Sequence, residues 1–426
     1  MNGFASLRGK KVGVWGAGVE GKATLRRLEV EGVSPLVVVS EDGSPETTSL
    51  HDGGLATLLA CDVVIKSPGI SRYCDEARQL REAGVRITIG LDLWMHEVDR
   101  ERVMCITGTK GKSTTSAIAQ ALMSGLGHSV LLGGNIGHAP WDPELDAADW
   151  YVIETSSYQA ADLTLGPATV VLTSLGEDHL PWHGDYRTYV SDKLSLATLP
   201  GVVNTIAPAW DAEIRKHHHL LGDQVTWIED ASPAWIDQLG VLGEHNRRNA
   251  LLARAALKAA QVPGASDDSA IEQAARNYTP LPSRLTLIGE IAGVKFVDDS
   301  LSTNALPTIA AIETFKTERL AVILGGEDRG IDYAPLAEAI AHHPGTLFIA
   351  AIPDSGERIA RSIEERIKGI VVERAPDLAA AVQTCFDWAK PNGVVLLSPA
   401  APSFGAFKDY ADRSRAFTAE MEKLRT

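Results

Sequence analysis

An apolar run that breaks into a glycine-rich loop, at residues 103–115, constrains the fold of this chain more than any other segment. The run predicts a buried strand, and the apolar periodicity that follows Lys112-Ser113 predicts a helix. In such a strand–loop–helix unit, backbone N–H groups and Lys112 can hold a phosphate, and Ser113 can reach a nucleotide-bound Mg²⁺. Ile106 occupies the position where a regular phosphate loop begins with glycine, so a plain glycine turn beside a surface lysine is the alternative.

Composition limits what such a chain can bind. The length of 426 residues suggests two to four domains, and a net charge of −15 argues against a nucleic-acid partner held by phosphate contacts. We expect no membrane insertion, because no apolar stretch is long enough and residues 1–8 lack a signal-peptide core. The four cysteines are scattered without metal-ligand spacing, which favours reduced thiols and a cytoplasmic location.

The first 97 residues predict a Rossmann-like domain. A strand at 10–14 leads into the glycine fingerprint Gly16–Gly21, a helix at 22–31 and a second strand that ends near the acids Glu41 and Asp42. Alone, this pattern is typical of nicotinamide-dependent dehydrogenases, whose acid binds a ribose. That alternative gives no role to the charged residues further along the chain.

The segment 98–281 predicts a central P-loop ATPase domain. After the loop, strands end at Glu154 and near the acid–histidine group that closes at His179, and Lys193 lies in a helical pattern from 186 to 199. The carboxyl ends of parallel strands share one sheet edge, so these residues are expected to converge. A buried core histidine and a solvated helix lysine are the ordinary alternatives for His179 and Lys193.

The segment 282–426 predicts a third, Rossmann-like domain, with strands ending at Asp299, before the turn 325–330 and at 394–397, and then a C-terminal helix. The predicted fold class is therefore α/β, with three consecutive doubly wound α/β domains.

Taken in order, these motifs resemble the Mur ligases, a family of ATP-dependent amide ligases of peptidoglycan precursor synthesis, and within it the glutamate-adding branch. The resemblance rests on the segments 107–113, 154–159, 177–179, Lys193, 245–249, 282–284, 299–300 and 397–410. It implies that ATP activates the carboxylate of UDP-N-acetylmuramoyl-L-alanine as an acyl phosphate, which a glutamate amine then attacks.

The resemblance also implies residue roles. Lys112, His179 and Lys193 would be catalytic; Ser113, Glu154, His179 and Lys193 would hold Mg²⁺ or Mn²⁺ at two sites, with Lys193 carbamylated. ATP would contact Gly108, Thr109, Lys110, Gly111, Lys112, Ser113, Thr114, Asn246, Asn249, Arg284 and Asp299. The UDP-linked substrate would contact Gly18, Val19, Gly69, Asn135, Ser156 and Gln159.

Several positions depart from the usual pattern of that branch. Glu20 replaces a small hydroxyl residue near the diphosphate, and Glu41 and Asp42 replace a threonine–arginine pair that faces uracil. In the third domain, Leu301 and Arg329 each stand where lysine is usual. The residues expected to bind glutamate are Thr303, Arg329, Ser403 and Tyr410.

These departures favour the less common ligases that add L-glutamate, with a glutamyl epimerase acting later in the pathway; D-glutamate is the alternative. A monomer is expected. A non-catalytic nucleotide-binding module and a folylpolyglutamate synthetase are further alternatives, and the latter is disfavoured because its phosphate loop lies near the N-terminus.

Overall fold

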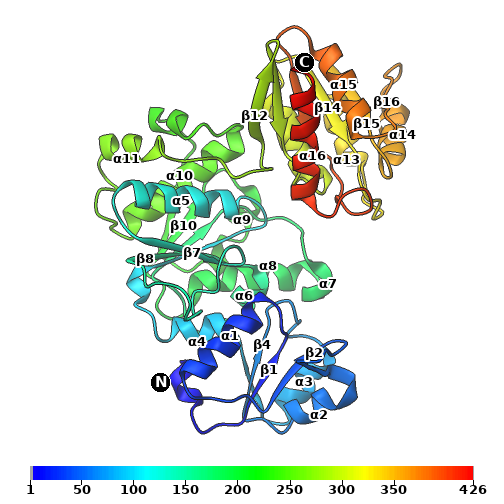
Figure 1. Ribbon diagram of the computed structural model, residues 1–426. Coiled ribbons are helices and arrows are strands. Elements are labelled where there is room, and N and C mark those ends of the chain that lie inside the picture. The colour runs from blue at the N-terminus through cyan, green and yellow to red at the C-terminus, as the bar shows by residue number, and fades with distance from the viewer. Residues whose placement is uncertain (1–2, 426) are drawn as a thin grey trace. The chain divides into compact units, whose positions relative to one another are not determined.

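Three β-sheets, each covered by helices, make up the protein in a computed structural model that describes residues 3–425 (Figure 1). The contacts divide the chain into two compact units. The first holds the chain up to Gln238 and Arg248–Tyr278, and the second holds Leu239–Arg247 and the chain from Thr279 onward. The predicted α/β fold class, with three consecutive α/β domains, is confirmed.

The first sheet is entirely parallel. Its strands, in spatial order, are β3 (Thr48–Ser49), β2 (Val37–Ser40), β1 (Val12–Trp15), β4 (Val63–Lys66) and β5 (Arg86–Thr88). Its helices are α1 (Val19–Val30), α2 (Leu55–Leu58), α3 (Asp75–Glu82) and α4 (Gly90–Met95). The chain order reverses between β1 and β4, so the loops that follow these two strands flank the crevice where ligands of such sheets bind.

The central sheet is also parallel and contains the phosphate loop. Its strands, in spatial order, are β11 (Val225–Ile228), β10 (Asn204–Pro208), β9 (Thr169–Leu172), β6 (Val103–Thr107), β8 (Trp150–Glu154) and β7 (Val130–Gly134). Its helices are α5 (Lys112–Gly125), α6 (Ser157–Asp162), α7 (Leu180–His183), α8 (Tyr186–Ser195), α9 (Ala212–Lys216), α10 (Glu244–Ala259) and α11 (Asp268–Ala275). Because β6 lies between β9 and β8, the ends of these three strands meet at one edge.

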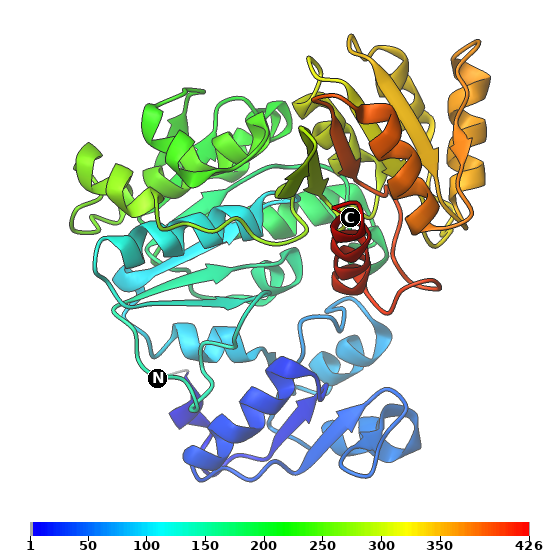
Figure 2. The ribbon, with the colours of Figure 1, turned by 45° about the horizontal axis from the view of Figure 1, so that its top comes forward.

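The third sheet is mixed, because β12 (Thr286–Ile291) runs antiparallel to β13 (Val294–Asp298). Parallel strands β17 (Val394–Leu397), β14 (Leu320–Leu324), β15 (Leu347–Ala351) and β16 (Glu373–Arg374) follow in spatial order. Helices α12 (Ala305–Thr314), α13 (Ala334–Ala341) and α14 (Gly356–Arg366) pack on one face, and α15 (Leu378–Ala389) and α16 (Tyr410–Lys423) on the other (Figure 2).

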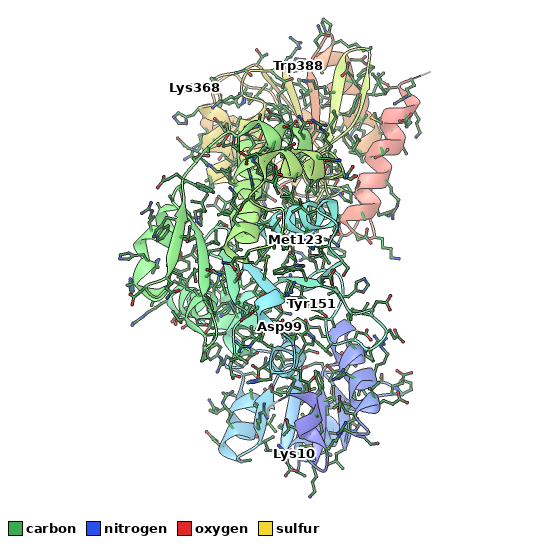
Figure 3. The ribbon with its side chains drawn as sticks, turned by 90° about the vertical axis from the view of Figure 1, so that its left-hand side faces the viewer. Lys10, Asp99, Met123, Tyr151, Lys368 and Trp388 are labelled. Atoms are coloured by element: carbon green, nitrogen blue, oxygen red, sulfur yellow. The ribbon has the colours of Figure 1, made fainter. Side chains whose placement is uncertain are left out.

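One hydrophobic core joins the first two sheets within the first unit. Tyr151 of β8 is labelled in Figure 3. Trp94 of α4 packs edge-on against it, with ring centroids 5.2 Å apart. Trp141, from the loop after β7, is buried and donates its Nε1–H to Thr24 Oγ1 of α1 at 3.1 Å. Shared apolar burial of this kind holds the two sheets in one unit.

The strands of continuous apolar sequence lie where the patterns predict them, whereas β3, β10, β11, β12, β15 and β16 are not predicted. Strand β12 has an irregular register near Leu287, and both residues of β16 are exposed, so neither has the apolar run of a buried strand. Among the described residues, every helix is too short or too polar to traverse a bilayer.

Candidate active site

The phosphate loop has a backbone that requires glycine. Gly108 and Gly111 have φ angles of 150° and 90°, and β6 ends directly before Gly108. A Cβ atom on Gly108 would collide with Thr173 Oγ1, and one on Gly111 would collide with Asn249 Oδ1. The loop therefore lies directly against the end of β9 and against Asn249, one of the predicted ATP contacts.

Side chains from neighbouring elements hold this loop in shape. Thr109 Oγ1 lies 2.7 Å from the hydroxyl of Tyr189 and donates to the carbonyl of Gly176 at 3.0 Å. Thr173 Oγ1 donates to the carbonyl of Lys110 at 2.6 Å, while Lys110 Nζ lies 3.5 Å from Asp178. The loop is thus organised by the protein itself, which lowers the cost of ordering it around a phosphate.

Two lysine ammonium groups converge on one carbonyl of the loop. Lys112 Nζ donates to the carbonyls of Gly108 and Thr109 at 2.9 and 3.1 Å, and Lys193 Nζ donates to that of Gly108 at 3.0 Å. Burial, and then the charge of Lys112, lower the pKa of Lys193 well below its ordinary value. Lys193 can therefore give up its proton more readily than a surface lysine.

Glu154 ends β8 at the same sheet edge and is buried. Its Oε1 accepts a hydrogen bond from Asn135 Nδ2 at 2.9 Å, whereas Oε2 has no hydrogen-bond partner among residues 3–425. A buried carboxylate oxygen without a donor fits a cation, because otherwise its desolvation is uncompensated.

His179 lies before α7 with a left-handed backbone, φ 54°. Its ring packs on Tyr158 at 4.9 Å, and burial lowers its pKa, which favours the neutral imidazole that ligates metals. In the described chain, no group of three or more His, Cys, Asp or Glu side chains is suited to hold a metal. The predicted metal ligands therefore include two groups besides Glu154 and His179. These are the hydroxyl of Ser113, which is buried in the first turn of α5, and Lys193 after its modification.

The residues predicted to contact the UDP-linked substrate lie on both sheets of the first unit. Gly18 and Gly69 are exposed in the loops after β1 and β4, at the crevice between these strands, and the exposed Val19 begins α1. Ser156 and Gln159 are buried and form the capping box of α6. In this capping box, the side chain of each residue accepts the backbone N–H of the other.

The acids that depart from the family pattern have different surroundings. Glu41 and Asp42 are exposed after β2, and Glu41 lies 3.5 Å from His51. Glu20 instead turns inward, and its Oε1 accepts a hydrogen bond from Gln159 Nε2 at 2.8 Å. Its carboxyl therefore contacts α6 from within the glycine fingerprint.

The remaining predicted ATP contacts belong to the second unit. Asn246 lies in α10 and donates to the carbonyl of Leu242 at 2.9 Å, and Arg284 is half-buried before β12. Asp299 follows β13 and accepts hydrogen bonds from Ser398 Oγ at 2.7 Å, from Ser302 Oγ and from the backbone of Leu285. Burial raises the pKa of Asp299 to about 7.

Three of the four residues predicted to bind glutamate lie in loops at the carboxyl edge of the third sheet, and the fourth, Tyr410, begins α16. Thr303 follows β13, Arg329 follows β14, and Ser403 and Tyr410 follow β17. These strands are adjacent, so their loops are neighbours. Arg329 Nε donates to Glu327 at 2.7 Å, and its guanidinium lies over the ring of Phe404 at 5.4 Å.

Arg413 is a residue of this edge that the sequence patterns do not predict. It is fully buried on α16, and its guanidinium donates to the carbonyls of Ser300 at 2.8 Å, Ala401 at 3.0 Å, Pro402 at 3.3 Å and Gly325 at 3.5 Å. It therefore links the three loops that carry the predicted glutamate contacts. The sequence feature that could have identified it is its spacing. Arg413, Phe417 and Met421 follow one another at intervals of four residues, and all three lie on the buried face of α16.

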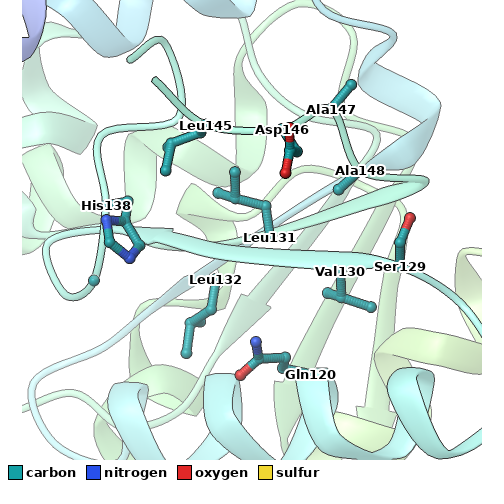
Figure 4. Close-up of a pocket in the computed structure, with 11 residues that line it drawn as sticks. Gln120, Ser129, Val130, Leu131, Leu132, His138, Leu145, Asp146, Ala147 and Ala148 are labelled. Atoms are coloured by element: carbon teal, nitrogen blue, oxygen red, sulfur yellow. The ribbon is translucent and has the colours of Figure 1, made fainter. Parts of the chain in front are cut away.

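A separate hollow lies beside the edge strand β7, in the first unit (Figure 4). Leu131 points to one side of the strand, toward Asp146, and Leu132 points to the other, toward Gln120. None of the predicted site residues lines this hollow.

Comparison with known proteins identifies the family to which this chain is similar. Residues 106–257 match the Mur ligase middle domain, and residues 283–401 match the glutamate ligase domain of Mur ligases. A Micromonospora protein is 38% identical over 97% of both chains, and a Salinispora tropica protein is 36% identical over 97% of this chain and 98% of its own. Both are named UDP-N-acetylmuramoyl-L-alanine–L-glutamate ligase.

Solved structures show the same fold. UDP-N-acetylmuramate-alanine ligase MurC from Thermotoga maritima superposes with a TM-score of 0.58 at 18% identity, covering 97% of this chain and 99% of its own. MurF from Acinetobacter baumannii superposes with a TM-score of 0.60 at 16% identity, covering 97% and 90%. With its sheets, its phosphate loop and these full-length relatives, the chain belongs to the Mur ligase family of ATP-dependent, ADP-forming amino-acid ligases.

Proposed function

We propose that this protein adds L-glutamate to the alanine carboxylate of UDP-N-acetylmuramoyl-L-alanine. The observation that carries the proposal is the convergence of Lys112 and Lys193 on the carbonyl of Gly108, at 2.9 and 3.0 Å, beside the end of β6. Full-length relatives named for this reaction support it. The ammonium of Lys112 at this loop suits transfer of a phosphoryl group to a carboxylate, in which charge neutralisation and positioning dominate. The lowered pKa of the buried Lys193 suits its modification to a carbamate.

The reaction divides between the two units. In the first, Lys112 neutralises the β- and γ-phosphates of ATP while the substrate carboxylate attacks the γ-phosphorus, which gives an acyl phosphate and ADP. Ser113, Glu154, His179 and a carbamylated Lys193 would hold Mg²⁺, which would neutralise phosphate charge when bound. The amine of glutamate then attacks the acyl carbon, and the tetrahedral adduct expels phosphate to leave the amide.

The second unit supplies the binding site for the amino acid in this proposal. Thr303, Arg329, Ser403 and Tyr410 bind glutamate, and the guanidinium of Arg329 can grip a carboxylate with two parallel hydrogen bonds where lysine cannot. Asn246, Arg284 and Asp299 are proposed contacts of ATP. L-glutamate is favoured over D-glutamate by the names of the relatives and by Arg329.

The protein would act as a cytoplasmic monomer, upstream of an epimerase that inverts the added glutamyl residue. The test is incubation with UDP-N-acetylmuramoyl-L-alanine, ATP, Mg²⁺ and each glutamate enantiomer, with phosphate release and product mass as readouts. Turnover with L-glutamate, lost in Lys112→Ala, is expected. Turnover with D-glutamate alone would refute the stereochemistry, and no turnover with either enantiomer would refute the function.

A further inference from the structure

Glu20 is an acid placed where an anion is expected. It lies in the first turn of α1, within the glycine fingerprint Gly16–Gly21, and a helix start of this kind attracts phosphate. Its carboxyl is largely buried, and Oε1 accepts the Nε2–H of Gln159 at 2.8 Å. Glu20 therefore connects the glycine loop of the first sheet with α6 of the central sheet.

This contact determines the orientation of the Gln159 amide. Gln159 is 1% exposed, and its Oε1 accepts the backbone N–H of Ser156 at 3.0 Å and the hydroxyl of Ser156 at 3.2 Å. The carbonyl end of the amide is thus committed to the capping box, and the amino end to Glu20. Loss of the Glu20 carboxyl would leave the buried Gln159 Nε2–H without its acceptor. The free-energy penalty of such a buried unsatisfied donor exceeds the contribution of a hydrogen bond at the surface.

The same helix is anchored to the first sheet at its other end. Asp162, the last residue of α6, forms a buried ion pair with Lys66 of β4, and Lys66 also donates to the carbonyl of Ile70 at 3.0 Å. Glu154 lies only two residues before the cap of α6. Contacts from the first sheet therefore hold the segment that follows the predicted metal-binding carboxylate.

We propose that Glu20 is a positioning residue that fixes the Gln159 amide, so that the glycine loop and α6 grip the UDP-linked substrate together. This inference rests on the proposed function, because Gln159 is a predicted contact of the muramoyl–alanine arm. Glu20 acts through Gln159 and takes no part in phosphoryl transfer. Its loss should weaken binding of the UDP-linked substrate and leave ATP binding unchanged.

The carboxyl also has an environment that limits its charge. Burial raises the pKa of Glu20 to about 7, against the smaller lowering effects of the Gln159 hydrogen bond and of Lys66. The charge that acts on the Glu20 carboxyl is that of Lys66 on β4, which is paired with Asp162 on α6. Below pH 7 a neutral Glu20 does not repel a diphosphate, whereas above pH 7 its ionised form does.

The experiment compares Glu20→Ala, Glu20→Gln, Gln159→Ala and the double variant Glu20→Ala/Gln159→Ala in the full chain. The matched control is Glu29→Ala, an exposed acid on the same helix. Steady-state kinetics give kcat and the KM values for UDP-N-acetylmuramoyl-L-alanine and ATP, and calorimetry gives the affinity for the UDP-linked substrate without ATP.

Glu20→Ala is expected to weaken binding of the UDP-linked substrate by about tenfold, or 1.4 kcal/mol. The KM for ATP and kcat should stay within about twofold of the wild type, as in Glu29→Ala. Glu20→Gln keeps an acceptor for Gln159, so its affinity should match the wild type at pH 6 and should no longer fall above pH 7. In the double variant the two losses should be less than additive.

Unchanged affinity in Glu20→Ala, additive losses, or a parallel loss of kcat and ATP affinity would each overturn the inference. If Glu20→Ala does not fold, the pH profile of Glu20→Gln decides, because a purely structural carboxyl would leave that profile like the wild type. A wild type that binds the UDP-linked substrate without turnover would refute the proposed function alone. A wild type that does not bind it would overturn both.

Discussion

Replacement of Arg413 by methionine should loosen the whole edge of the third sheet. The guanidinium joins the carbonyls of Ser300, Gly325, Ala401 and Pro402, which belong to loops after three different strands. Burial lowers the pKa of Arg413 to about 10, so the group is still charged at neutral pH. Methionine would fill much of the space but would leave these carbonyls without the cation.

The two shorter bonds, at 2.8 and 3.0 Å, set the magnitude. Hydrogen bonds from a charged donor contribute roughly 1.5–3 kcal/mol each, so Arg413→Met should destabilise the second unit by about 3–6 kcal/mol. The KM for glutamate should rise about tenfold or more, because the contacts on these loops lose their common anchor. The affinity of the first unit for the UDP-linked substrate should not change.

Urea unfolding of the full chain and hydrogen exchange of residues 299–303, 325–330 and 399–404 would measure these effects. Arg415→Met is the matched control, because Arg415 is on the same helix with its side chain 66% exposed. We expect that control to differ from the wild type by no more than about 0.5 kcal/mol. Equal urea unfolding midpoints and equal protection of the three loops from hydrogen exchange in the two variants would refute the role of Arg413 in holding these loops together.

Three further changes test other parts of the site. Lys193→Ala should reduce turnover at least a hundredfold, and wild-type activity should fall when bicarbonate and CO₂ are removed; activity indifferent to both would refute carbamylation. Asp299, whose pKa rises from 3.8 to about 7 on folding, should make the protein less stable as pH rises from 4 to 7, by about 4 kcal/mol at most. Urea unfolding should show that the free energy of unfolding depends less steeply on pH in Asp299→Asn than in the wild type. An equally steep dependence would contradict the assigned role of Asp299. Gly108→Ala should abolish nucleotide binding in a fluorescent-ATP assay, because its Cβ collides with Thr173, whereas Ser124→Ala, exposed further along α5, should bind normally.

Much of the fold could be predicted because buried parallel strands leave a local signature. The strands β6, β8, β14 and β17 are continuous apolar runs followed by glycine or polar residues, as expected where both faces of a sheet are covered. Strand β16 has two exposed residues and depends on pairing with β15, so no local pattern identifies it.

The candidate site could also be predicted only in part from local sequence patterns. Glu154 and Asp299 could be placed beforehand at strand ends, since parallel strands bring their carboxyl ends to one edge. Their local chemistry could not be predicted. The unpaired Oε2 of Glu154 and the raised pKa of Asp299 both result from burial by segments distant in sequence.

The sequence by itself determined the strand–loop–helix unit at residues 103–115, because glycine conformations and apolar periodicity act over a few neighbouring residues. Only the tertiary structure decided what surrounds that unit. It brought Lys193 to the carbonyl of Gly108, Glu20 to Gln159 and Arg413 to Ser300. These partners are separated by 85, 139 and 113 positions, and desolvation and hydrogen bonding between such distant groups exist only once the sheets have formed.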